Sequence, residues 1–166
     1  MKTTAFFTRM LSWLTGSRLT VDNSVVRELD LDRFLGSWYE VARFDHFFER
    51  GMSQTRANYV LRDDGNIDVI NTGIKNGKPK TAKGKAKLTD IPSLLRVSFF
   101  GPFYSDYRVM LVDADYRYML IGSGSDGYLW ILSRTPQLAD SDRTAILSDA
   151  KSRGYDTDKL IWVKQD

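Results

Sequence analysis

The chain has 166 residues, and its 24 Lys and Arg against 21 Asp and Glu give a net charge of only +3. At roughly 150 residues per domain the length predicts one domain, and 42% hydrophobic residues predict a globular chain with a real core. With no Cys and one His, disulfides, thiolate nucleophiles and Cys-based or multi-His metal sites are excluded, and no cofactor is predicted. So small a charge surplus gives no reason to expect nucleic-acid binding.

The first 28 residues differ from the rest, and the folded domain is expected over residues 29–166. Lys2 precedes an apolar stretch, but Arg9 interrupts the run that a secretory signal needs. Ser17 then stands where a bacterial lipidation site would carry its Cys, so no lipid anchor is expected there. The segment is interpreted as either a degenerate signal or a short amphipathic helix.

Short strands separated by tight turns follow one another along the middle of the chain. The turns are marked by Asp-Gly or Asn-Gly pairs that end at Gly65, Gly77 and Gly127. The predicted strands are residues 38–44, 54–61, 67–70, 81–88, 95–99, 108–112, 117–121 and 128–133. This all-β pattern indicates an antiparallel up-and-down barrel or a sandwich. A helix is predicted over residues 141–153 and a last strand over residues 160–163.

One aromatic residue and one basic residue mark the beginning and the end of the series of predicted strands. Trp38 opens the first strand, and Arg134 ends the eighth. A cup-shaped barrel needs one sealed end, which a large aromatic side chain can plug, and an arginine can lie across its indole in a cation–π contact. We therefore expect one closed and one open end.

Three separated segments together resemble the lipocalin family. Gly36 and Trp38 are similar to its G-x-W block, Asp115 and Tyr116 to its T-D-Y block with Ala in place of Thr, and Arg134 to its third-block arginine. The resemblance runs over residues 29–163. It implies an eight-stranded antiparallel lipocalin (calycin) barrel with one flanking C-terminal helix, closed at the end that carries these five residues.

The resemblance also implies a cavity that binds a fatty acid or lysophospholipid. Strand alternation starting from Trp38 and Arg134 assigns inward faces on the first and eighth strands, and the resemblance assigns them elsewhere. The predicted cavity residues are Trp38, Glu40, Ala42, Asn58, Val109, Leu111, Leu120, Tyr128 and Trp130.

The fourth strand alternates small and basic residues. Ala82, Gly84 and Ala86 are predicted to face inward, where their small size leaves room for an acyl chain. In an open cup, a larger side chain at Gly84 is expected to enter empty volume. Lys83 and Lys85 then face outward with Lys87, as a solvated face or as a contact with anionic lipid headgroups.

The predicted function is non-catalytic binding, storage or transport of the lipid, for membrane maintenance. One alternative is a lipocalin-type enzyme using Glu40 and Asp45; His46 is interpreted as a loop histidine. Another is an interaction protein that forms a homodimer through the aromatic residues 99–104, which could also act as a cavity lid. The bacterial cell envelope, in the periplasm or at the outer membrane, is the favoured location, with the cytoplasm as the other.

Overall fold

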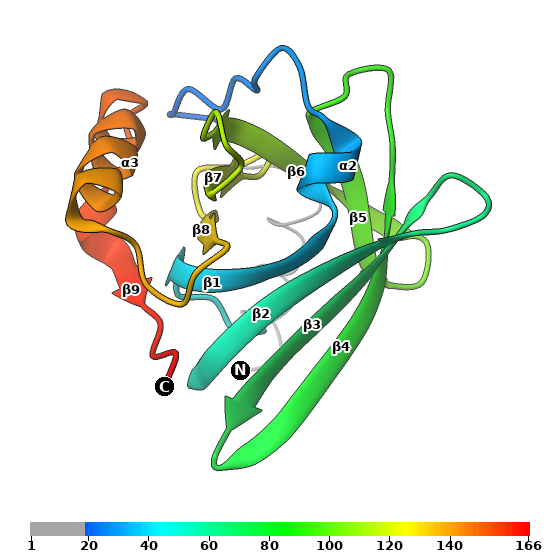
Figure 1. The fold of residues 1–166 in the computed structure, drawn as a ribbon, viewed down its shortest axis with the longest axis horizontal. Coiled ribbons are helices and arrows are strands. Elements are labelled where there is room, and N and C mark those ends of the chain that lie inside the picture. Colours follow the sequence, from blue (N-terminus) through cyan, green and yellow to red (C-terminus); the bar gives the residue numbers. More distant parts are fainter. Residues whose placement is uncertain (1–18) are drawn as a thin grey trace, which may run out of the picture.

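A computed structural model describes residues 19–166, in which nine strands form one antiparallel sheet (Figure 1). Each strand lies where alternation or a turn predicts one, with ends shifted by a few residues. The strands are β1 Gly36–Phe44, β2 Met52–Leu61, β3 Ile67–Lys75, β4 Lys78–Lys87, β5 Leu94–Phe100, β6 Phe103–Val112, β7 Tyr118–Gly122, β8 Leu129–Ser133 and β9 Leu160–Trp162.

The sheet closes on itself because β1 pairs with both β8 and β2. The strands β1 to β8 thus form an antiparallel up-and-down barrel. This confirms the barrel and excludes the sandwich, which is the other architecture that the strand pattern allows. The first half of β1 pairs with β2, from Gly36↔Tyr59 to Tyr39↔Arg56. Its second half pairs with β9, from Ala42↔Trp162 to Phe44↔Leu160, so the last strand extends the sheet beyond the barrel.

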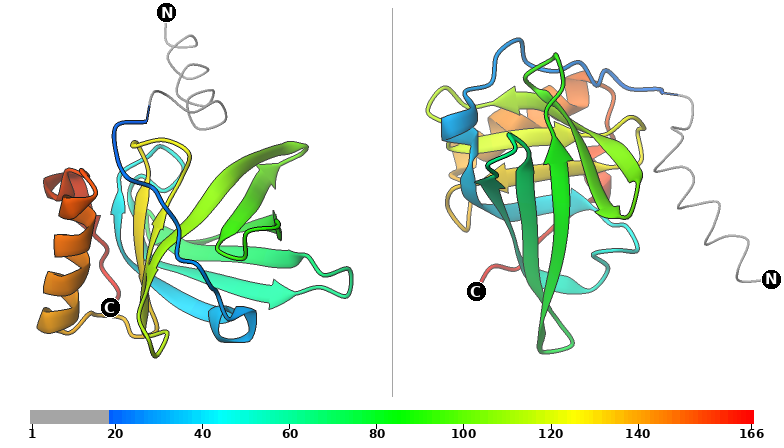
Figure 2. Two further views of the ribbon diagram at one scale, coloured as in Figure 1. Left: turned by 90° about the horizontal axis from the view of Figure 1, so that it is seen from above. Right: turned by 90° about the vertical axis from the view of Figure 1, so that its right-hand side faces the viewer.

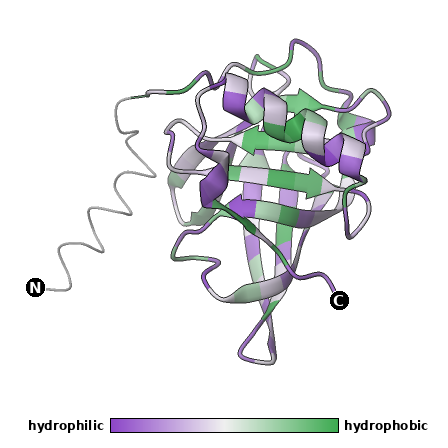
Figure 3. Cartoon of the chain, turned by 90° about the vertical axis from the view of Figure 1, so that its left-hand side faces the viewer, coloured by the Kyte–Doolittle hydropathy of each residue, from purple (hydrophilic) through white to green (hydrophobic). Residues whose placement is uncertain are grey.

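Helix α3, Asp140–Ser152, lies against the outside of the barrel (Figures 2 and 3). Its Ile146 and Ala150 are fully buried in an outer core between the helix and the strands. The short 3-10 helix η1, Thr157–Lys159, then leads into β9. Within residues 19–166, no helix is both long and apolar enough to span a bilayer.

Residues 19–28 run along the barrel as an extended segment with no helix. The Asp22 amide donates to the Arg153 carbonyl at 2.8 Å, and the Val26 amide donates to the Val109 carbonyl at 3.0 Å. Of the segment 1–28, interpreted as a degenerate signal or an amphipathic helix, residues 1–18 lie outside the described residues, and residues 19–28 contain no helix.

Candidate functional site

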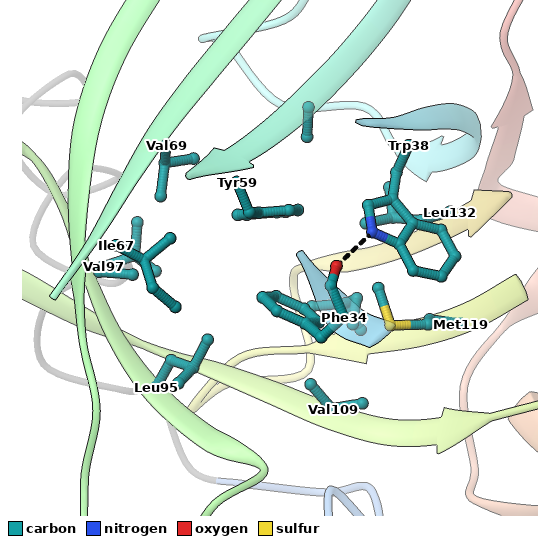
Figure 4. Packing of buried hydrophobic residues seen from close by; sticks show 13 residues of the cluster. Phe34, Trp38, Tyr59, Ile67, Val69, Leu95, Val97, Val109, Met119 and Leu132 are labelled. Carbon is teal, nitrogen blue, oxygen red and sulfur yellow. Dashed lines mark hydrogen bonds between the residues drawn. The ribbon is translucent and has the colours of Figure 1, made fainter. Parts of the chain in front are cut away.

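One end of the barrel is closed by a single-turn helix that sequence analysis did not predict. Helix α2, Leu31–Phe34, is capped by the Asp30 side chain, which accepts from the Arg33 amide. Phe34 is fully buried, and its ring centroid lies 4.7 Å from that of Tyr59. The Trp38 indole donates to the Phe34 carbonyl at 2.8 Å (Figure 4). Together these rings form the floor of the barrel.

Arg134 holds this floor against the first strand. Its guanidinium carbon lies 3.6 Å from the centroid of the Trp38 ring, and its nitrogens donate to three main-chain carbonyls, of Arg33, Leu35 and Ser37. Gly36 has φ = +95°, and a Cβ there would lie 3.5 Å from Arg134 Nη1. That distance is an ordinary contact, so the left-handed backbone, rather than a lack of space, favours glycine at this position.

The turn between β6 and β7 adds the other two residues of the closed-end motif. Tyr116 adopts φ = +55°, and its hydroxyl accepts from the Asp30 amide at 2.7 Å, with the Arg33 guanidinium 4.6 Å from its ring centroid. The Asp115 amide donates to the Asp113 carboxylate at 3.1 Å, which shapes the turn. The turn thus anchors helix α2 from outside.

A cavity of about 470 Å³ occupies the barrel above this floor and opens at the opposite end. Tyr59 and Tyr107, whose hydroxyls are 2.7 Å apart, belong to its lining, and burial raises the pKa of both phenols. The apolar part of the wall consists mainly of Ala57, Val69, Ala82, Val97, Phe99, Ile121, Trp130 and Leu132. The volume lies in the range of pockets that hold one small ligand.

The predicted cavity residues fall into three groups in the structure. Glu40, Tyr128 and Trp130 line the cavity. Trp38 and Val109 face into the barrel but belong to the packed closed-end core. The other four point away from the cavity: Ala42, Leu111 and Leu120 pack in the outer core, and Asn58 accepts from the Ser37 hydroxyl at 3.3 Å.

Bulges explain two of these differences. In β1 the register shifts between Glu40 and Ala42, so Val41 and Ala42 both face the outer core and Arg43 turns inward. In β6 the shift lies between Val109 and Leu111. A bulge inserts one residue and reverses the alternation that follows it. On β2 and β7 the assigned face is wrong by one residue, since Ala57, Tyr59 and Ile121 line the cavity instead of Asn58 and Leu120.

The expectation of empty volume beside Gly84 is also wrong. A Cβ at this position would lie 2.6 Å from the Ser98 carbonyl oxygen and 2.7 Å from Phe99 Cδ1. The register of β5 and β6 shifts between Val97 and Phe100, and the Phe99 ring in this irregular stretch lies against the glycine. Ala82 does line the cavity, whereas Ala86 is fully buried in the closed-end core.

Gly84→Leu is therefore expected to lower the free energy of unfolding, by about 1–3 kcal/mol, as for other overpacked cores. The backbone oxygen of Ser98 cannot move aside without distorting β5. Denaturant unfolding measures the change, with Lys83→Leu on the exposed face of the same strand as the matched control. Equal stability of Gly84→Leu and the parent would show that the space beside Gly84 is open.

Sequence analysis did not predict a buried polar network on one wall of the cavity. Arg43, which is 2% exposed, donates to Glu40 Oε1 at 3.1 Å. Its Nη2 donates to the carbonyls of Glu49 and Met52 at 2.8 and 3.2 Å, and so ties the β1–β2 loop to the strand. Glu49 Oε1 accepts from His46 Nε2 at 2.8 Å and from the Trp130 indole at 3.1 Å.

The pKa values of the two carboxyl groups of this network shift in opposite directions. Burial, together with the adjacent charge of Glu49, raises the pKa of Glu40 well above its ordinary 4.5 and favours its neutral form. Burial alone would raise the pKa of Glu49 too, but hydrogen bonds from His46 and Glu40 lower it to about 2. Glu49 is therefore the carboxylate, and His46 carries its proton on Nε2 because a carboxylate only accepts.

These shifts predict that the contribution of this pair of carboxyl groups to stability is largest near pH 4.5. The contribution of Glu40 is complete below its unfolded pKa of 4.5 and is lost as the pH rises toward its folded pKa, by up to about 1.4 kcal/mol per pH unit. The contribution of Glu49 to stability is lost as the pH falls from 4.5 to about 2. Glu40→Gln should flatten the alkaline limb in denaturant unfolding from pH 4 to 8. A parent–variant difference that stays constant over this range would contradict the assignment.

The network escapes prediction because it is built across a loop. The sequence alone favours an ordinary loop histidine at His46, but the loop folds back and places it against Phe48, Tyr128 and Trp130, with ring centroids 5.5–5.8 Å away. One signal is available in the sequence. The chain's only His has an acid three residues later, and the buried strand before it carries a second acid and an arginine.

The mouth of the cavity is bordered by two kinds of side chain. Lys75 and Lys80 come from the β3–β4 hairpin, and Phe48 and Phe100 come from the β1–β2 loop and the end of β5. The cavity is therefore apolar over much of its wall, polar along β1, and cationic and aromatic at its opening. This arrangement suits a molecule with one apolar chain and one polar end.

Comparison with known proteins agrees with this geometry. A lipocalin-like domain is recognised over residues 29–165. The outer membrane lipoprotein Blc of Citrobacter freundii is 49% identical over 86% of this chain and 82% of that protein, and Blc of Vibrio cholerae serotype O1 is 42% identical over 97% and 98%. Insecticyanin of the tobacco hornworm Manduca sexta shares the fold at a TM-score of 0.68, with 21% identity over 85% of this chain and 84% of its own. The chain belongs to the lipocalin family.

Proposed function

We propose that the protein binds one single-chain lipid, a fatty acid or a lysophospholipid, in the barrel cavity. The observation that carries the proposal is a cavity closed at one end by packed aromatic rings and lined largely by apolar side chains. An eight-stranded barrel holds about one small ligand, so one acyl chain fits this site better than two.

The chain enters tail first and leaves its polar end at the mouth. Val69, Val97, Ile121 and Leu132 offer apolar contact inside the barrel, and Lys80 offers a cation at the opening. A carboxylate or phosphate headgroup is favoured beside the lysine, while the reverse orientation would bury that charge in the apolar wall. The polar end thus decides the direction of binding.

Burial of the chain alone does not select this ligand from a membrane. Some 16 methylenes at about 0.8 kcal/mol each amount to roughly 13 kcal/mol relative to water. A lipid in a bilayer is already out of water, so this contribution nearly cancels on transfer. Selectivity therefore depends on cavity width and on the groups at the mouth.

The proposed role is non-catalytic storage or transport of the lipid. The acidic and basic groups that face the cavity along β1 are engaged with one another: Glu40 with Arg43, and Glu49 with His46 and Trp130. Asp45, the other candidate acid, forms a surface ion pair with Arg50 at 3.2 Å. These contacts favour a structural role for the groups over acid–base chemistry.

Titration with a fluorescent fatty acid tests the proposal. Trp130 lines the cavity, so binding should quench tryptophan emission with a stoichiometry of about one ligand per barrel. Trp130→Phe should remove most of the quenching and keep the binding, whereas Trp162→Phe, on β9 outside the barrel, should leave the quenching intact. Absence of displaceable binding by the delipidated protein would refute the proposed function.

The names of the Blc proteins, which are outer membrane lipoproteins, support the bacterial cell envelope as the proposed location, in the periplasm or at the outer membrane. Membrane maintenance is the role that we propose for the bound lipid. A homodimer through the aromatic residues 99–104, of which Phe100 and Phe103 are 52% and 53% exposed, is the alternative use of this surface. Sedimentation equilibrium of the purified protein measures the oligomeric state. Fractionation of the native host measures the location.

A further inference from the structure

The open end of the barrel exposes a group of aromatic rings. Phe100 and Phe103 pair across the Gly101–Pro102 turn, and each is more than half exposed. The ring of Phe48 lies 5.6 Å from that of Phe100, and the ring of Phe47 lies 4.1 Å from that of Phe48, measured between centroids. Two exposed rings, backed by the half-buried Phe47 and Phe48, form an aromatic surface of the kind that marks a site of interaction.

A cationic hairpin lines the same cavity as two of these rings. The turn between β3 and β4 projects from the open end of the barrel (Figure 1), where Lys75 pairs in register with Lys78 and is followed by Lys80. No acidic residue occurs over residues 75–89. In the part of the chain that the structure describes, none of these three ammonium groups forms an ion pair. Their charge is therefore available to a partner.

The two features border one opening, since Phe48, Phe100, Lys75 and Lys80 all line the mouth of the same cavity. The closed end lacks this combination: its exposed apolar side chains are aliphatic, and Leu61 and Ile91 lie within two residues of Asp63 and Asp90 in the sequence. Aromatic rings flanked by unpaired lysines suit the headgroup region of an anionic bilayer. A second copy of the chain facing this surface symmetrically would bring lysine toward lysine.

We propose that the open end of the barrel docks onto an anionic lipid bilayer. Phe100 and Phe103 insert among the headgroups, and Lys75, Lys78 and Lys80 lie against their phosphates. The cavity mouth then faces the membrane, so that a lipid enters without crossing bulk water. That last consequence rests on the proposed function, whereas the docking does not.

Sedimentation with vesicles tests the docking. The protein should bind vesicles of equal parts phosphatidylglycerol and phosphatidylcholine more tightly than vesicles of phosphatidylcholine alone. The difference should shrink from about 0.1 M to about 1 M salt, over which the Debye length falls from about 10 to about 3 Å. Equal binding to both vesicles would overturn the proposal.

Two variants outside the cavity lining locate the surface. Lys78→Glu should weaken binding to the anionic vesicles about 25-fold, because it reverses one charge at about fivefold per unit. Phe103→Ser should weaken it about tenfold through loss of apolar contact. The matched controls are Lys151→Glu on helix α3 and Ile91→Ser at the closed end, which should stay close to the parent. Controls that weaken binding as much as the mouth variants would overturn the proposal.

Two further measurements separate membrane docking from self-association and from lipid binding in the cavity. If the surface serves a second copy instead, Phe103→Ser will convert a dimer into a monomer in sedimentation equilibrium, and the parent will not prefer anionic vesicles. A fluorescent fatty acid titrated in the absence of vesicles reports the cavity alone. Loss of that binding with intact docking refutes the proposed ligand, whereas loss of docking with an intact cavity refutes the inference made here.

Discussion

Replacing Arg43 by alanine is expected to lower the free energy of unfolding by about 3–5 kcal/mol, the range for a buried ion pair that loses one partner. The guanidinium is almost fully buried and bonds the Glu40 carboxyl and two loop carbonyls. Its removal leaves the carboxylate of Glu49, 4.0 Å away, without its nearest buried cation. Denaturant unfolding at pH 7 measures the change.

Three variants separate charge from geometry in this network. Arg43→Lys keeps the cation but not the planar fork that reaches several acceptors, so it should recover only part of the loss. Arg43→Met combined with Glu49→Gln removes both charges and should recover more. Arg56→Ala, where the side chain is exposed and stacks on Tyr39 at 4.4 Å, is the matched control and should cost far less. Arg43→Ala within about 1 kcal/mol of the parent would contradict the role assigned to the buried arginine.

Arg134→Ala is expected to cost about 2–3 kcal/mol, from the lost cation–π contact and the carbonyls left without a donor. Arg134 lies at the closed end, beneath the floor of the cavity, so affinity for the lipid should change little. The midpoint of thermal unfolding and the fluorescent fatty-acid titration measure the two quantities on the same sample.

The matched control for this variant is Arg117→Ala. That arginine is 53% exposed, so solvent partly screens its ion pairs with Asp113 and Asp142, and the cost should be smaller than for Arg134→Ala. An Arg134→Ala protein with unchanged melting but much weaker lipid binding would reverse the assignment of the two ends of the barrel.

The strand order and the closed end could be predicted because their signals are local or strongly patterned. Asp-Gly and Asn-Gly pairs locate the hairpin turns, and the run of residues that begins at Trp38 locates β1. The positions of Trp38 and Arg134 at the beginning and end of the strand series are sufficient to place both at one end of a closed barrel. Helix α2 escapes prediction because a single turn has no hydrophobic period of its own.

The inward faces of the strands could not be predicted throughout, because alternation holds only until a bulge. It places Glu40 correctly on the cavity wall, but it fails at Ala42, one bulge later. A bulge depends on the pairing of two strands, so a single strand read alone does not reveal it. The space beside Gly84 could not be predicted for a similar reason. Phe99, on the neighbouring strand, fills the space that a side chain at this position would occupy.

The hydrogen bonds of Arg134 at the closed end constrain the sequence differently at the donor and at the acceptors. Arg134 donates to the main-chain oxygens of Arg33, Leu35 and Ser37, and every amino acid supplies such an oxygen. The exposed acceptor position Ser37 is therefore free to change as long as the backbone keeps its path, whereas the Arg33 side chain also lies on the Tyr116 ring. Position 134 has no such freedom, because only arginine combines a planar cation with enough donors for all three carbonyls. A library randomised at positions 37 and 134 would vary at position 37 and keep arginine at position 134.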